Sequence, residues 1–87
     1  MENTGKNAKQ IIQAEIQAMY ASFHSSEFTS LGIGMNHWMR LDCMLIMTRK
    51  IIETHQPGTG QHTFYQAVER KILEYRDFPS KFQTEIL

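Results

Sequence analysis

The segment from residue 35 to residue 54 constrains this chain most, because it carries apolar side chains around its whole circumference. At about 100° per residue, the spacing of an α-helix, these side chains form three stripes. The first stripe is Trp38, Leu41, Leu45 and Ile52, with Thr48 in the gap; the second is Met44, Met47 and Ile51; the third is Met35, Met39, Cys43 and Ile46. A helix that is apolar on all sides must be covered on all sides. We therefore expect a central helix over about residues 35–54 that needs partners on three sides.

Two further helices are predicted, one before and one after this segment. Their predicted starts are two capping boxes, Asn7 with Gln10 and Thr63 with Gln66. The helices then extend over about residues 8–24 and 63–78. Each has a single apolar face: Ile12, Ile16, Met19, Tyr20 and Phe23 on the first, and Phe64, Val68, Ile72 and Tyr75 on the second.

Breaks in the helical pattern set the limits of these elements. Pro57 and Gly58 suit the two central positions of a type II turn, which ends the central helix. Pro79 ends the last helix, and Ser80 with Gln83 is expected to cap one more short turn. That turn carries Phe82, Ile86 and Leu87, while residues 1–6 are expected to be a frayed start. The prediction is one domain over residues 1–87, a small all-α three-helix bundle with a short C-terminal turn.

The small size of the chain favours self-association. For 87 residues, apolar burial barely offsets an ordering cost of about 1.5 kcal/mol per residue. Cys43 is the only cysteine, so no disulfide forms within the chain. The two outer helices each cover one stripe of the central helix, which leaves one stripe without an obvious partner. We expect this stripe to be an interface, either with a second copy in a homodimer or with another protein. The interface candidates are Met35, Met39, Cys43, Met44, Ile46, Met47 and Ile51. The alternative is a monomer in which the C-terminal turn and the connector residues Phe28 and Leu31 cover the stripe.

Charge and hydropathy exclude several classes of partner. Nine basic and nine acidic residues give a net charge of zero, and neither sign forms a run. Attraction to nucleic acid or to an anionic membrane is therefore not expected. The N-terminus lacks the layout of a signal peptide, and no apolar stretch approaches the ~18 residues of a membrane span. We expect a cytoplasmic protein.

No pattern of catalytic or metal-binding residues is present. His24, His37, His55 and His62 do not form the paired spacings of zinc sites. Met35, Met39 and Cys43 follow one another at i, i+4 spacing, which suits Cu(I) but is more typical of packing. Cys43 lies in an apolar run, where a neutral thiol is expected. The charged residues Arg40, Asp42, Arg49 and Lys50 are interpreted as the rim of an interface. We expect no enzyme, no metal and no cofactor.

The function predicted from these features is that of a helical protein–protein interaction module, which acts by binding as a regulator, adaptor or inhibitor, as a homodimer. One alternative is a DNA-associated transcriptional regulator. Against it, the connector before the central helix is too long for a helix-turn-helix, and acidic residues interleave with Arg70, Lys71 and Arg76. A small metal- or haem-binding accessory protein is the third possibility.

Overall fold

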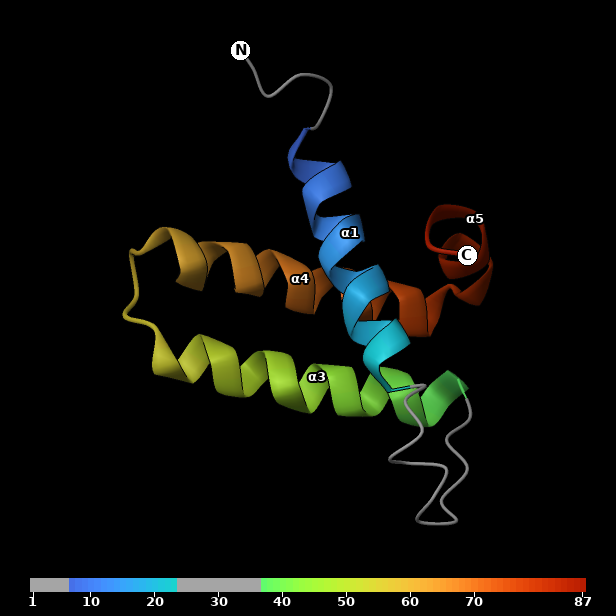
Figure 1. Ribbon diagram of the computed structural model, residues 1–87, viewed down its shortest axis with the longest axis horizontal. Helices are drawn as coiled ribbons and strands as arrows, with labels where there is room; N and C mark the ends of the chain where they lie inside the picture. The colour runs from blue at the N-terminus through green and yellow to red at the C-terminus, as the bar shows by residue number, and fades with distance from the viewer. Residues whose placement is uncertain (1–6, 24–36) are drawn as a thin grey trace.

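The computed structural model describes residues 7–23 and 37–87, and these residues form four α-helices. Labelled as in Figure 1, they are α1 (Ala8–Ser22), α3 (His37–Thr54), α4 (Gly60–Asp77) and α5 (Pro79–Glu85). The two described ranges contain no strand, so the prediction of an all-α domain is confirmed. The frayed start and the connector with Phe28 and Leu31 lie outside the described residues.

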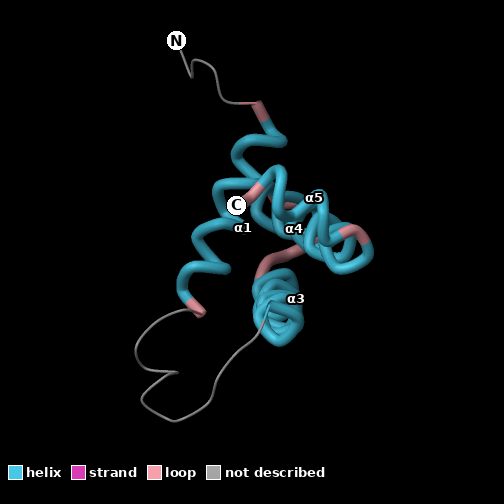
Figure 2. The backbone as a smooth tube through the Cα atoms, turned by 90° about the vertical axis from the view of Figure 1, so that its right-hand side faces the viewer, coloured by secondary structure: helices cyan, strands magenta, loops and turns pink. Residues whose placement is uncertain are grey.

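The helices form two layers. α3 and α4 make an antiparallel hairpin, and α1 crosses one face of it at a steep angle (Figure 1). The view along α3 places α1 to one side of the α3–α4 layer (Figure 2). α5 turns back beside α1 at the C-terminal end of α4. α1 therefore divides one face of the hairpin, and α5 lies on one side of it.

The core lies where these helices meet. Its buried residues are Ile16, Met19, Leu41, Met44, Leu45, Val68, Ile72, Tyr75, Phe82 and Ile86. Ile12, Tyr20, Phe23 and Phe64 pack against this cluster from its edges. The apolar faces predicted for the first and last long helices are thus confirmed. The Phe82 ring joins three elements, because its centroid lies 4.8 Å from that of Tyr20 on α1 and 5.4 Å from that of Tyr75 on α4.

The start of α1 agrees with the predicted capping box. The Asn7 side chain accepts a hydrogen bond of 2.9 Å from the backbone N–H of Gln10, and the Gln10 side chain accepts one of 3.1 Å from the backbone N–H of Asn7. These two bonds satisfy backbone donors that have no partner within the helix. α1 ends at Ser22, with Phe23 as its C-cap.

The predicted start of the next long helix was wrong by one turn. α4 begins at Gly60, and its N-cap is Thr59, whose side chain accepts a 3.2 Å hydrogen bond from the backbone N–H of His62. Thr63 therefore lies inside the helix. The physical reason is the Pro57–Gly58 turn, which already directs the chain into the helix: Gly58 has φ +92°, and the Thr59 N–H donates to the Gln56 carbonyl at 3.2 Å. The predicted turn itself is confirmed.

The C-terminal segment forms a helix of seven residues, where only a turn capped by Ser80 and Gln83 was predicted. That cap is wrong: α5 begins at Pro79, and Phe78 precedes it without a side-chain cap hydrogen bond. Proline is well suited to the first helical position, because its fixed φ is helical and its missing N–H would have no partner there. Pro79 thus ends α4 and begins α5.

Candidate interaction groove on α3

The core takes up most of the first apolar stripe of α3 and one residue of the second. Leu41, Leu45 and Thr48 of the first stripe are buried, and α3 packs most extensively against α4. The buried Thr48 hydroxyl has a hydrogen-bond partner, because it donates to the Met44 carbonyl at 2.7 Å. Met44 of the second stripe is fully buried. It has no surface to offer a partner and drops out of the interface candidates.

The other interface candidates lie at or near the surface. Ile46 is 60% exposed and Met39 is 41% exposed, whereas Cys43, Met47 and Ile51 are half-buried. Met35 lies outside the described residues. The third stripe is therefore the one with most of its surface exposed, together with the edge of the second.

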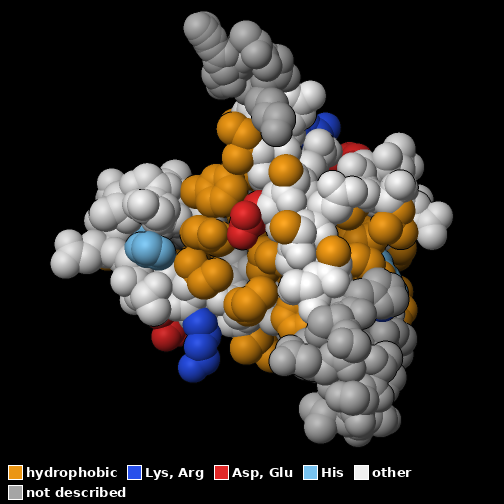
Figure 3. All heavy atoms as spheres, viewed as in Figure 1, with side chains coloured by type: hydrophobic (Ala, Val, Ile, Leu, Met, Phe, Trp, Pro, Cys, Tyr) orange, Lys and Arg blue, Asp and Glu red, His pale blue; other side chains and the backbone are white. Residues whose placement is uncertain are grey.

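The crossing angle of α1 explains why these side chains remain accessible. α1 crosses α4 and reaches α3 only near its own C-terminal end (Figure 1). α5 contacts the very beginning of α3, where the Phe82 ring centroid lies 4.8 Å from that of His37. Among the described helices, none lies along the C-terminal half of α3 on this face. Figure 3 shows further hydrophobic side chains at the surface beside α1, over α3 and α4.

A groove of about 470 Å³ follows this part of α3. Its lining consists of Phe23, Cys43, Ile46, Met47, Lys50, Ile51 and Thr54. Six of these residues repeat along one helix at spacings of three and four, and Phe23 at the end of α1 supplies the remaining wall. The groove is open along its length and almost entirely apolar, which favours contact with side chains from another helix.

The charges next to the groove differ in what they contact. Arg49 pairs with Glu69 of α4 at 2.8 Å, and Asp42 is 3.4 Å from Arg76 of α4. Both pairs tie α3 to α4. Lys50 makes no ion pair with any residue of the described ranges, and it is exposed. It is the one charged side chain in the groove lining.

Sequence reasoning missed Phe23, Lys50 and Thr54 as members of this surface. Lys50 follows Ile46 by four residues and Cys43 by seven, so its helical position alone placed it on the stripe. Its charge led to its interpretation as a rim residue. Phe23 has no comparable signal, because its place depends on how α1 crosses α3. Arg40, also interpreted as a rim charge, is buried, and its guanidinium lies 4.7 Å from the centre of the Tyr20 ring.

His37 and His55 lie at opposite ends of the α3–α4 hairpin, and His24 lies outside the described residues. His37 lies between Tyr20 and Phe82, and its Nδ1 is 3.1 Å from the Tyr20 hydroxyl. Burial, and then the positive charge of Arg40, lower the pKa of His37. His55 stacks on Tyr65 at the other end of the hairpin, with ring centroids 6.4 Å apart. Within the described ranges, no three His, Cys, Asp or Glu residues are arranged to hold a metal ion.

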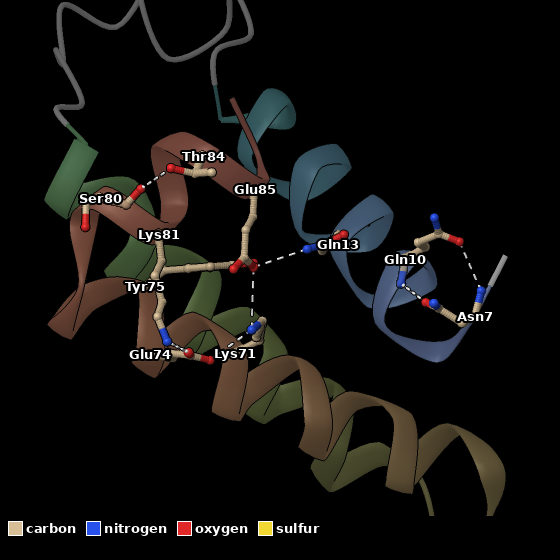
Figure 4. A network of polar contacts seen from close by, with 10 residues as sticks. All are labelled: Asn7, Gln10, Gln13, Lys71, Glu74, Tyr75, Ser80, Lys81, Thr84 and Glu85. Carbon is tan, nitrogen blue, oxygen red and sulfur yellow. Dashed lines mark hydrogen bonds and ion pairs between the residues drawn. The ribbon is translucent and has the colours of Figure 1, made fainter.

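A network of polar contacts holds α5 to α1 and α4 (Figure 4). Glu85 accepts hydrogen bonds from the Tyr75 hydroxyl at 2.7 Å and from the Gln13 side chain at 3.1 Å, and Lys71 lies 3.5 Å from it. Lys71 and Lys81 both donate to Glu74, at 3.0 and 2.6 Å. The Gln17 side chain donates to the Ile86 carbonyl. This network explains why the C-terminal segment is fixed beside α1 and away from the groove.

Comparison with known proteins gives no relative for this chain: no family model, no curated protein and no solved structure matches it. In the described part of the chain, each helix is too short or too polar to pass through a lipid bilayer. The groove is therefore interpreted from its own geometry and chemistry.

Proposed function

We propose that this chain is a helical protein–protein interaction module that acts by binding, as a regulator, adaptor or inhibitor. The groove on α3 is its contact surface. The observation that carries the proposal is an apolar groove of about 470 Å³ along one helix of so small a chain. Exposed apolar surface of this kind is characteristic of binding sites, because leaving it in water has a cost that a partner removes.

Self-association is one form of this proposal. Two copies related by a two-fold axis would bring the same stripe of α3 from each copy together, and the contact would bury Ile46 and complete the cover of Met47 and Ile51. The additional burial would also compensate for the small core of the chain. The homodimer predicted from the sequence therefore remains a proposal, with the α3 groove as its interface.

DNA binding receives less support. Two of the three basic residues that the alternative requires are engaged with acidic side chains: Lys71 with Glu74 and Glu85, and Arg76 with Asp42. Paired in this way, they present little positive field to a phosphate backbone.

Sedimentation equilibrium over a range of protein concentrations tests self-association. A charge in the groove would be buried without a partner on association, so Ile46→Asp is expected to shift a dimer formed through the groove to monomer. Ile46 is 60% exposed in the single chain, so the folded monomer tolerates the change. Ile11→Asp is the matched control, because Ile11 is an exposed isoleucine of α1, 44% accessible, that does not line the groove.

The control variant is expected to associate like the wild-type chain. A dimer that survives Ile46→Asp but dissociates with Ile11→Asp would contradict the groove as the contact surface. A wild-type chain that is monomeric at all concentrations would rule out the homodimer, and binding to a second protein would then have to carry the function.

A further inference from the structure

The length of the groove and the spacing of its lining residues suit the binding of one helix. At about 1.5 Å per residue, the run from Cys43 to Thr54 is about 16 Å long, or three helical turns. Its lining residues recur every three or four positions, which matches the ridge spacing of a facing helix. The amphipathic helix that fits such a groove presents apolar side chains at i, i+3 or i+4, and i+7.

α5 is an example, within this fold, of a short amphipathic helix packed against the other helices. α5 lies on the other side of α1 and buries Phe82 and Ile86, which are four residues apart, at 0% and 4% exposure. Between them in the chain, Glu85 is bound by the Tyr75 hydroxyl and lies near the Lys71 ammonium. An apolar pair and an adjacent carboxylate are thus the elements that hold α5 in place.

The charge beside the groove favours the same combination of an apolar pair and an adjacent carboxylate in a bound helix. Lys50 is its one charged lining residue and has no acidic partner in the described ranges. On the helical projection, Asp42 and Glu53 fall on the edge of the exposed face of α3 that is next to Ile46 and opposite Met47 and Ile51. Glu53 follows Lys50 by three residues, so Lys50 lies between this acidic edge and the apolar side chains of Met47 and Ile51. A two-fold contact centred near Lys50 would bring a second Lys50 to it, whereas a carboxylate would complement the first.

We propose that the occupant of the groove is an acidic amphipathic helix of another protein. Apolar side chains one helical turn apart fill the space between Cys43 and Thr54, and an adjacent Asp or Glu pairs with Lys50. This inference rests on the proposed function, since it specifies the partner of the same surface. A homodimer through the groove is the competing occupant.

The test uses a phage-displayed library of helix-forming peptides of about 15 residues, selected on the full chain. Selected peptides are expected to carry apolar residues at i and i+3 or i+4 with an Asp or Glu beside them. Their affinities are then measured by fluorescence anisotropy for the wild-type chain and for Lys50→Glu. Reversal of the charge is expected to weaken binding about fivefold at low salt, and the difference should shrink as salt is added.

Two controls make this measurement specific. Arg70→Glu makes the same change of charge at an exposed site of α4 outside the groove lining, and it should leave the affinity unchanged. A peptide whose acidic residue is replaced by Lys should regain affinity for Lys50→Glu and lose it for the wild-type chain. That exchange of preference requires direct pairing between the two positions.

The outcomes separate this inference from the proposed function. Equal affinities for Lys50→Glu and Arg70→Glu would overturn the acidic partner, and the groove would remain the binding surface if Ile46→Asp still abolished peptide binding. A failure to select peptides on a chain that dimerises through Ile46 would assign the groove to a second copy, against this inference. A chain that selects no peptide and stays monomeric would overturn both.

Discussion

Glu74 and Glu85 show how single side chains secure the C-terminal part of the fold. Glu74 is bound by Lys81 and Lys71, and these hydrogen bonds lower its pKa from 4.5 to about 2. The hydrogen bond from the Tyr75 hydroxyl is the main cause of the lowered pKa of Glu85. Both carboxyls therefore hold protons less readily in the folded chain than in the unfolded one. Each contributes stability in its ionised form.

The lowered pKa values of Glu74 and Glu85 predict that the fold loses stability as the pH falls. A carboxyl with a lowered folded-state pKa contributes its full stability above about pH 4.5 and loses it as the pH falls toward 2. We expect the urea midpoint of the wild-type chain to fall across this window. In Glu74→Gln the fall should be shallower, because one of the responsible groups no longer titrates.

Glu53→Gln is the control for this titration, because Glu53 is exposed and makes no ion pair in the described ranges. Its midpoint should fall with pH as steeply as that of the wild-type chain. If Glu74→Gln follows the wild-type curve throughout, the contacts of Glu74 with Lys71 and Lys81 do not stabilise the fold.

At the same scale, the sequence predicted apolar positions well and charged ones poorly. The faces with Ile16 and Met19 and with Val68 and Ile72 followed from helical spacing, because burial depends on the period of the apolar residues. The burial of Arg40 over Tyr20 could not be predicted, because it depends on which helix lies against that side of α3. Lys50 was assigned to the rim by its charge, although its spacing places it in the groove.

At the scale of the elements, two threonines, Thr59 and Thr63, are candidates for the N-cap of α4. Thr63 with Gln66 matches the capping-box pattern, yet Thr59 caps α4. Thr59 comes directly after the Pro57–Gly58 turn, and an N-cap requires the extended backbone found at that point, with ψ 159°. The Pro57–Gly58 turn therefore determines where α4 begins. The capping-box pattern alone, which takes no account of this turn, places the start of α4 about three residues too late.

Two substitutions test which threonine is the cap. Thr59→Ala removes the hydroxyl oxygen that accepts a hydrogen bond from the His62 N–H, and it is expected to lower the free energy of unfolding by about 1 kcal/mol. Thr63→Ala changes an exposed residue inside the helix and should leave stability nearly unchanged. Urea unfolding of both variants provides the comparison. A larger loss for Thr63→Ala than for Thr59→Ala would show that α4 begins at the later residue in solution.

At the scale of the whole molecule, the central feature is the division of one face of the α3–α4 hairpin by α1. α5 lies on one side of α1, held by Phe82 and the Glu85 contacts, and the groove follows α3 on the other, with no α4 residue in its lining. The apolarity of the central helix predicted an excess of apolar surface, because its stripes follow from spacing. Which stripe would stay exposed could not be predicted, since this depends on the crossing angle of α1 and on the place of α5. Both depend on contacts between residues far apart in the chain, such as Gln13 with Glu85.

Methyl NMR of the isoleucine and methionine side chains tests most directly that the α3 groove is the binding surface. Spectra are recorded as the protein concentration is raised and as a selected helical peptide is added. Our account predicts shifts for the methyl groups of Ile46, Met47 and Ile51 in at least one titration, while those of Ile11 and the buried Ile72 stay in place. Shifts at Ile11 with unchanged signals from Ile46, Met47 and Ile51 would contradict it.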